Sequence, residues 1–137
     1  MSIRDTALAF ADACDTGKGW EICKQWCTED ASFECQADAL GEITDLKGYV
    51  EWAKDLLTPV PDGRYELKGC GVDEERGLAM VLSVFKGTQT GEGGPVPPTG
   101  KSIASDYMYA LKFEDGKICG MHKVWNDGHG LKQLGWA

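Results

Sequence analysis

The residues best suited to acid/base chemistry lie close together near the end of the chain. Lys123, Asp127 and His129 fall within a stretch where an alternating apolar and polar pattern runs into glycines. A carboxylate beside Met121 and Trp125 is partly shielded from water, which raises its pKa toward that of a useful general base. We therefore expect Asp127 to act as base and acid on a carbonyl compound, with Lys123 or His129 polarising the carbonyl oxygen.

Strand geometry sorts the residues of this stretch by face, because side chains alternate along a strand. The alternation assigns Cys119, Met121, Lys123, Trp125 and Asp127 to one face, and Ile118, Gly120, His122 and Val124 to the other. Lys123 and Asp127 would then lie roughly 13 Å apart, too far for contact but close enough to border one cavity. His122 is interpreted as structural or interfacial. Two alternatives stay open: Asp127 simply ends the strand, and His129 is a solvated loop residue.

Aromatic residues elsewhere in the chain supply candidate walls for a pocket. Five tryptophans are many for 137 residues, and aromatic walls suit a flat, apolar ligand. Core filling is the alternative role for most of them. The residues expected to line the pocket are Trp125, Met121, Tyr109, Trp52 and Cys35.

Helices come first and extended segments follow. The apolar spacing predicts helices over 3–15, 19–27 and 46–57, the first capped by Ser2 and the third by Thr44 or Asp45. Strands are expected over 31–35, 64–72, 78–88, 101–113 and 117–125, with a hairpin turn at 114–116. This order predicts one α+β domain over residues 1–137, with three N-terminal helices packed on an antiparallel sheet.

The charge and composition of the chain argue against several classes of binding partner. The net charge of −8, with no basic stripe, argues against nucleic acid and against anionic membrane surfaces. No apolar run approaches a membrane span, and the N-terminal residues do not resemble a signal peptide, so a cytoplasmic protein is expected. The six cysteines are then reduced and mostly buried, and no CxxC pair indicates a metal site. Strand 78–88 is apolar on both faces, which favours a homodimer.

The glycine- and proline-rich stretch 91–102 superficially resembles a phosphate-binding loop. The position that would need the first glycine of such a loop is Pro95, and its prolines lack the N–H groups that cradle phosphate. We expect a long connection between strands, which could act as a lid over a pocket.

Almost the whole chain resembles the nuclear transport factor 2-like superfamily, and within it the SnoaL-like polyketide cyclase group. The resemblance rests on the order of elements and on five short motifs. They are Asp30-Ala-Ser-Phe33, Leu46-Lys-Gly-Tyr49, Pro98-Thr-Gly-Lys101, Asp115-Gly-Lys-Ile118 and Trp125…Asp127…Leu131-Lys-Gln-Leu-Gly135.

The resemblance implies a cone-shaped, strongly curved sheet with an apolar pocket at its open end, a homodimer, and no metal or organic cofactor. It also implies that Asp127 occupies the place of the cyclases' acid/base, which closes a ring by an intramolecular aldol step. Ketosteroid isomerases of the superfamily carry their base where this chain has Cys35, which argues against isomerase chemistry of that type. Because many members only bind ligands, a non-catalytic protein that binds a small apolar molecule is the alternative.

Overall fold

The computed structural model describes residues 1–137. Its helices are α1 (Ile3–Asp15), α2 (Trp20–Cys23), α3 (Leu46–Leu56) and α4 (Asp127–Leu134), with short 3-10 turns at Lys24–Trp26 and Asp38–Leu40. Its strands are β1 (Cys27–Cys35), β2 (Arg64–Asp73), β3 (Leu78–Thr88), β4 (Ser102–Glu114) and β5 (Lys117–Trp125). None of the helices is both long and apolar enough to cross a membrane.

One five-stranded sheet forms the body of the molecule, in the order β1-β5-β4-β3-β2. The four long strands are antiparallel neighbours, as predicted. β1, however, pairs in parallel with β5, so that Cys35 lies opposite Lys123. The sheet is therefore mixed rather than purely antiparallel. A parallel pair needs a long connection, and here the connection from β1 to β5 runs through α3 and three other strands.

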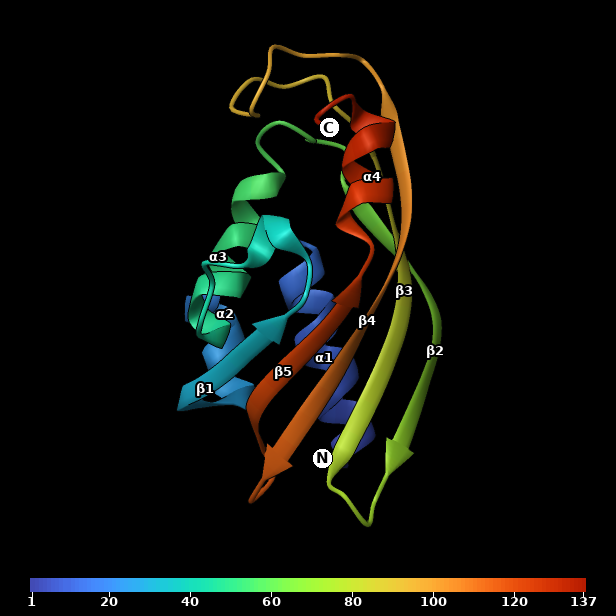
Figure 1. The fold of residues 1–137 in the computed structure, drawn as a ribbon. Coiled ribbons are helices and arrows are strands. Elements are labelled where there is room, and N and C mark those ends of the chain that lie inside the picture. Colours follow the sequence, from blue (N-terminus) through green and yellow to red (C-terminus); the bar gives the residue numbers. More distant parts are fainter.

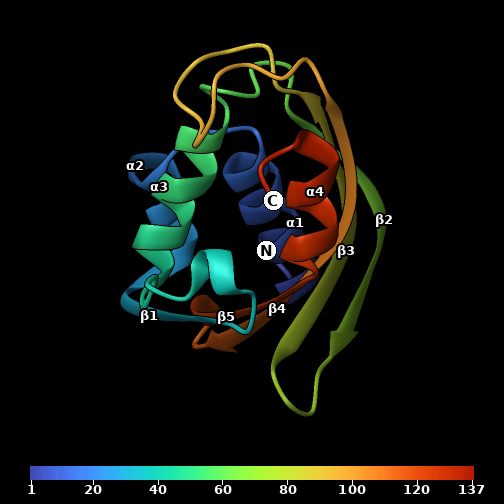
Figure 2. The ribbon, with the colours of Figure 1, turned by 45° about the horizontal axis from the view of Figure 1, so that its top comes forward.

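The sheet curves around the helices. Figures 1 and 2 show α1 and α3 on its inner side, with α4 beside β4 near the open end of the curve. The core lies between α1, α3 and the inner face, where Phe10, Leu46, Val50, Val81 and Leu111 are almost fully buried. This arrangement confirms the expected α+β cone with three N-terminal helices.

Short-range sequence signals determine where two of the helices begin and where one hairpin turns. The Ser2 hydroxyl accepts a hydrogen bond from the Asp5 amide, and the Asp45 carboxylate accepts one from the Gly48 amide, so both predicted caps are confirmed. Asp115 and Gly116 both have positive φ and form the predicted tight hairpin between β4 and β5.

The second helix is shorter than predicted. It ends at Cys23, a 3-10 turn follows, and Cys27 already belongs to β1. The apolar spacing of Trp20, Cys23 and Cys27 matched a helix, but Cys27 is buried as a strand residue next to Ile118. Periodicity over so few residues cannot separate a helix from a helix followed by a strand.

A β-bulge in β5 changes which side of the sheet its first residues face, so the predicted alternation is wrong there. Lys112 pairs with Gly120 and Phe113 pairs with Ile118, so Cys119 is an extra residue on β5. Strict alternation put Ile118 on the same face as His122, yet Ile118 is fully buried and His122 is exposed. Met121, Lys123 and Trp125, beyond the bulge, keep their predicted common face.

The segment after β5 is helical, although no helix was predicted there. Asn126 caps α4 by accepting a hydrogen bond from the His129 amide, and Gly135 ends the helix with a left-handed conformation. Gly128 and Gly130 make this stretch a poor helix former by propensity. Gly130 nevertheless fits the site, because a Cβ there would lie only 3.0 Å from the Ser105 hydroxyl on β4. Close packing on β4 therefore selects the helix.

Removing the cap of α4 is expected to weaken the C-terminal end of the fold. Asn126→Ala loses the hydrogen bond to the His129 amide and should lower the free energy of unfolding by about 1 kcal/mol. Asn126→Asp keeps an acceptor at the same place and is the matched control. Urea denaturation measures both, and equal losses in the two variants would contradict a capping role.

Candidate functional site

An aromatic pocket opens between the helices and the inner face of the sheet. Its empty volume is about 570 Å³ with the open mouth included. Most of its lining is apolar or aromatic. The lining residues are Asp15, Tyr49, Trp52, Ala53, Leu56, Phe85, Ile103, Ser105, Tyr107, Tyr109, Lys123, Trp125, Leu131 and Leu134.

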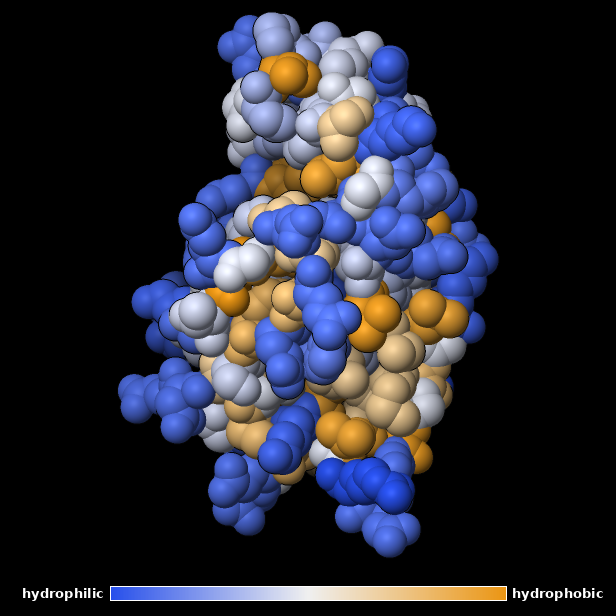
Figure 3. Space-filling model, in the orientation of Figure 1, coloured by the Kyte–Doolittle hydropathy of each residue, from blue (hydrophilic) through white to orange (hydrophobic).

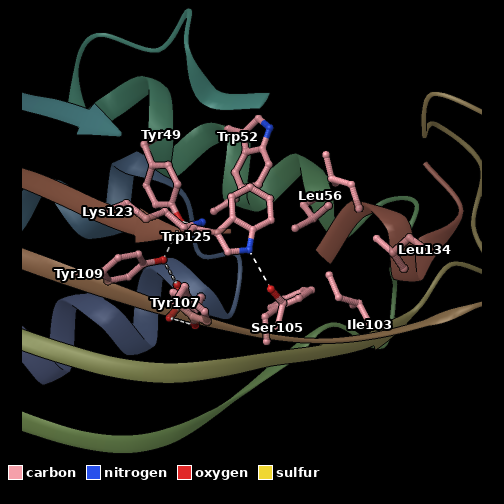
Figure 4. A pocket seen from close by; sticks show the side chains of 14 residues that line it. Tyr49, Trp52, Leu56, Ile103, Ser105, Tyr107, Tyr109, Lys123, Trp125 and Leu134 are labelled. Atoms are coloured by element: carbon pink, nitrogen blue, oxygen red, sulfur yellow. Dashed lines mark hydrogen bonds between the residues drawn. The ribbon is translucent and has the colours of Figure 1, made fainter. Parts of the chain in front are cut away.

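The pocket has a polar end and an apolar end. Figure 4 shows Lys123, Tyr49, Tyr107 and Tyr109 gathered on one side and the aliphatic residues on the other, with Trp52 and Trp125 between them. Leu56 of α3 and Leu134 of α4 belong to the aliphatic end. A ligand with one polar group and an apolar body matches this division.

A chain of hydrogen bonds connects the ionisable residues at the polar end. The Lys123 ammonium donates to the Tyr49 hydroxyl at 2.9 Å, and the hydroxyls of Tyr49 and Tyr109 are 2.7 Å apart. Asp15 accepts from Tyr109 at 2.5 Å and from Tyr107 at 2.6 Å. Since Tyr109 gives its proton to Asp15, its oxygen accepts from Tyr49. Each hydrogen bond between Lys123 and Asp15 is therefore donated in the same direction, toward Asp15.

Burial shifts both ends of this chain toward neutral pH. Asp15 is 7% exposed, and desolvation raises its pKa to about 6 although two tyrosine hydroxyls and Lys123 favour the carboxylate. Lys123 is 5% exposed, and desolvation lowers its pKa to about 8 although Asp15 favours the ammonium. Desolvation also raises the pKa values of Tyr49, Tyr107 and Tyr109, so these residues stay neutral. An acid and a base of near-neutral pKa thus share one pocket.

Aromatic rings surround the Lys123 ammonium. The nitrogen lies 4.4 Å from the Trp125 ring centroid, 4.9 Å from that of Tyr49, 5.2 Å from that of Trp52 and 5.3 Å from that of Tyr107. The faces of aromatic rings attract a cation, which partly replaces the water that burial removes. Tyr49 is itself held in place by stacking on Phe33 at 4.7 Å.

Several residues expected in the site do line the pocket. Lys123 is at its polar end, Tyr109 belongs to the hydrogen-bond chain, and Trp52 and Trp125 form the middle of the pocket. The Trp125 indole N–H donates to the Ser105 hydroxyl at 2.9 Å, which fixes the plane of the ring.

Other expected residues lie nearby but outside the lining. Met121 is buried in the core, and Cys35 is partly buried beside Lys123 on the neighbouring strand, where its sulfur accepts a hydrogen bond from the Ala37 amide. Asp127, in the first turn of α4, accepts a hydrogen bond from the Ala39 amide at 2.9 Å. His129 is exposed, with its ring 3.3 Å from the Gln133 side chain. The catalytic roles of Asp127 and His129 remain predictions.

The long connection after β3 packs against the end of α4. The buried Gln89 accepts a hydrogen bond from the Thr99 amide, and the Thr99 hydroxyl donates to the Leu134 carbonyl. Gly94 faces the Trp136 ring, where a Cβ would lie 2.9 Å away. The connection holds α4, whose leucines close one side of the pocket, but none of its own residues lines the pocket.

Asp15 was not predicted as a site residue, although the sequence contains a signal for it. Asp15 lies four residues after Ala11, so it continues the apolar stripe of the first helix, where a charge is unexpected. Tyr107 and Ser105 were missed although they share the strand face of Tyr109 by simple alternation. A buried charge on a helix and hydroxyls on the facing strand are the usual trace of a polar site inside a core.

The fold belongs to the nuclear transport factor 2-like class, also known from ketosteroid isomerases. The model of the SnoaL-like polyketide cyclase family matches residues 4–134, so the chain belongs to this family. Among curated protein sequences, none matches the chain.

Solved structures support the same class. IdmH, a candidate polyketide cyclase from Streptomyces antibioticus, has a TM-score of 0.81 at 20% identity, covering 98% of this chain and 99% of its own. AclR, a candidate hydroxylase from Streptomyces galilaeus, gives 0.78 at 20% identity, with 98% and 85% covered. A hypothetical protein with a ketosteroid isomerase-like fold from Catenulispora acidiphila, solved in complex with trimethylamine, gives 0.71 at 14% identity, with 96% and 93% covered. At these identities the likeness concerns the fold.

The raised pKa of Asp15 has a consequence for stability. Its usual value is 3.8 and its folded value about 6, so its contribution is fully present below pH 4 and is lost as the pH rises through 6. Between pH 4 and pH 7 the wild type should lose on the order of 3 kcal/mol relative to Asp15→Asn, which cannot ionise.

Urea unfolding of both proteins across this pH range measures that difference. Asp5→Asn, which changes an exposed aspartate in the first turn of the same helix, is the matched control. A gap between wild type and Asp15→Asn that stays constant with pH would show that Asp15 is not held in a desolvating site.

Proposed function

We propose that the protein is an acid/base enzyme of cyclase or isomerase type that removes a proton next to the carbonyl of a small apolar compound. The observation that carries this proposal is the pairing of Lys123 and Asp15 inside an aromatic pocket. Family membership supports the same class of chemistry. The chain's own side chains supply the acid and the base.

The division of the pocket assigns the roles. The carbonyl oxygen of the compound accepts a hydrogen bond from the Lys123 ammonium, which stabilises the negative charge that develops on the oxygen as an enolate forms. Asp15, ionised at neutral pH, takes the proton from the adjacent carbon. The apolar body packs against Trp52 and Trp125 and reaches toward Leu56 and Leu134. In a cyclase, the enolate then attacks a second carbonyl of the same molecule.

Asp127 is the alternative base, since the family resemblance places the cyclases' acid/base there. Its carboxylate is bound to the Ala39 amide and lies outside the pocket lining. The two assignments therefore predict opposite effects of changing Asp15 and Asp127.

The six unpaired cysteines fit a reducing compartment, and we propose a cytoplasmic location on this ground.

Hydrogen exchange on a simple ketone tests the proposed activity. Tetralone in D2O, followed by proton NMR, reports removal of the hydrogens beside its carbonyl. We expect the protein to accelerate their loss above the buffer rate, and Lys123→Met and Asp15→Asn each to reduce the acceleration by 10²-fold or more. Lys132→Met, which changes an exposed lysine of α4, is the matched control and should keep full activity.

Three other outcomes decide between the alternatives. Loss of exchange in Asp127→Asn with retention in Asp15→Asn would transfer the role of the base to Asp127. Thermal stabilisation by tetralone without exchange would identify a binding protein. Absence of both effects would contradict a pocket for apolar carbonyl compounds.

We also propose that two copies of the chain pair through the outer face of the sheet. Figure 3 shows apolar side chains gathered over the strands on the face that Figure 1 presents. Val124, Met108 and Leu82 lie side by side across β5, β4 and β3, and Val124 and Leu82 are 54% and 43% exposed. A continuous apolar row of this kind is unusual on an unpartnered sheet face.

A charge in this row should separate the copies. Leu82→Glu places carboxylates opposite one another across the proposed interface, where desolvation and repulsion both oppose pairing. Light scattering after size exclusion is expected to give twice the chain mass for the wild type and one chain mass for Leu82→Glu. Thr28→Glu, on β1 away from the row, is the control. A wild type of one chain mass at high concentration would contradict the dimer.

A further inference from the structure

The Lys123 side chain has more hydrogen-bonding capacity than the protein uses. An ammonium carries three N–H donors, and the only acceptor bonded to it is the Tyr49 hydroxyl. The other directions around the nitrogen face aromatic rings and the pocket. Lys123 is the only lysine among the pocket-lining residues, so the pocket contains one amine that a bound molecule can reach.

The same geometry provides a route by which the ammonium can lose a proton without releasing it to water. The hydrogen bonds run from Lys123 through Tyr49 and Tyr109 to Asp15, each hydroxyl accepting from one neighbour and donating to the next. A proton shift along this chain leaves a neutral amine and a neutral carboxylic acid. Burial reduces the free-energy difference between the ionised pair and this neutral pair, because an uncharged amine and acid are easier to hold in an apolar site.

We propose that Lys123 is a nucleophilic amine that forms a Schiff base with an aldehyde or unhindered ketone bound in the pocket. The inference rests on the proposed function, since it concerns the same pocket and the same carbonyl class, and it replaces a hydrogen bond to the carbonyl by a covalent bond. Buried lysines in apolar sites are suited to this role because a larger fraction is unprotonated near neutral pH.

The atoms balance within the site. The Lys123 proton passes to Asp15, the free electron pair on nitrogen forms a bond to the carbonyl carbon, and the C=O π electrons move to oxygen. One nitrogen proton then moves to this oxygen, and the proton held on Asp15 returns through the tyrosines to the resulting hydroxyl. Water leaves, and the products are a protonated imine on Lys123, one water molecule and the Asp15 carboxylate.

The iminium ion then serves the proposed chemistry. It withdraws electrons from the adjacent carbon more strongly than the carbonyl does, so the same Asp15 carboxylate removes a proton more easily. Trp52 and Trp125 flank the position of the new bond, and both rings lie close to the Lys123 nitrogen. The centroids of these two rings are 6.1 Å apart, so a flat, conjugated carbonyl compound packs against the rings rather than between them, and the apolar walls slow hydrolysis of the imine.

Reductive trapping tests the inference. The protein is incubated with naphthaldehyde and sodium cyanoborohydride, which reduces imines to stable amines, and the products are analysed by intact mass and peptide mapping. We expect one adduct on the Lys123 peptide, formed at least tenfold faster than on any exposed lysine. Lys123→Met should lose this adduct, and Lys132→Met should keep it. Wild-type peptide mapping decides the site even if Lys123→Met folds poorly.

The tyrosine relay has its own controls. Tyr49→Phe breaks the hydrogen-bond chain and should slow adduct formation at Lys123, whereas Tyr65→Phe, which removes a hydroxyl bonded to Asp12 outside the pocket, should not. Naphthalenemethanol, which cannot form an imine, reports binding alone through thermal stabilisation. Binding of this alcohol without an adduct at Lys123 would overturn the covalent step and leave the proposed function intact. Neither binding nor adduct would overturn both.

Discussion

The buried charge of Lys123 is the constraint on which the pocket depends. An ammonium removed from water is strongly destabilising unless other groups replace the lost hydration. Here the replacement comes from the neutral Tyr49 hydroxyl, from four aromatic rings and, beyond the Tyr109 hydroxyl, from the Asp15 carboxylate. Neither ionised group touches the other, so both remain available to a third molecule. A direct ion pair would have stabilised both charges and left less chemistry for the pocket.

This chain of contacts also explains how separate elements are held together. Asp15 is the last residue of α1, and Tyr49 lies near the start of α3. Tyr107 and Tyr109 belong to β4, and Lys123 belongs to β5. The hydrogen bonds therefore join both inner helices to the centre of the sheet. A network of this kind is stable only if every member is satisfied, so the loss of one hydroxyl affects its partners as well. The curvature of the sheet brings these residues close while the helices exclude water.

Much of the fold could be predicted from the sequence, because its signals are local. The caps at Ser2 and Asp45, the Asp115-Gly116 turn and the order of helices before strands all follow from residue types at short spacing. α4 could not be predicted this way, because the contact of Gly130 with β4 selects it against its own low helix propensity. The parallel pairing of β1 depends in the same way on the whole sheet.

The site was predictable in part. Lys123, Trp125, Trp52 and Tyr109 could be assigned to a pocket from strand alternation and aromatic content. Asp15 could not be connected to them, because it is 108 positions before Lys123 in sequence and meets it only through two tyrosines. The cluster of Lys123, Asp127 and His129 is close in sequence, but only its lysine lines the pocket, because the chain turns into α4 at Asp127.

The most direct test of this account is to titrate the two ionisable ends of the relay in the same protein. NMR of the Asp15 carboxyl carbon and of the Lys123 side-chain nitrogen, assigned with Asp15→Asn and Lys123→Met, gives both pKa values. The account predicts a pKa of about 6 for Asp15 and about 8 for Lys123, with each signal responding to the titration of the other. An Asp15 pKa near 3.8 together with a Lys123 pKa near 10.5 would contradict it, since both groups would then be solvated and independent.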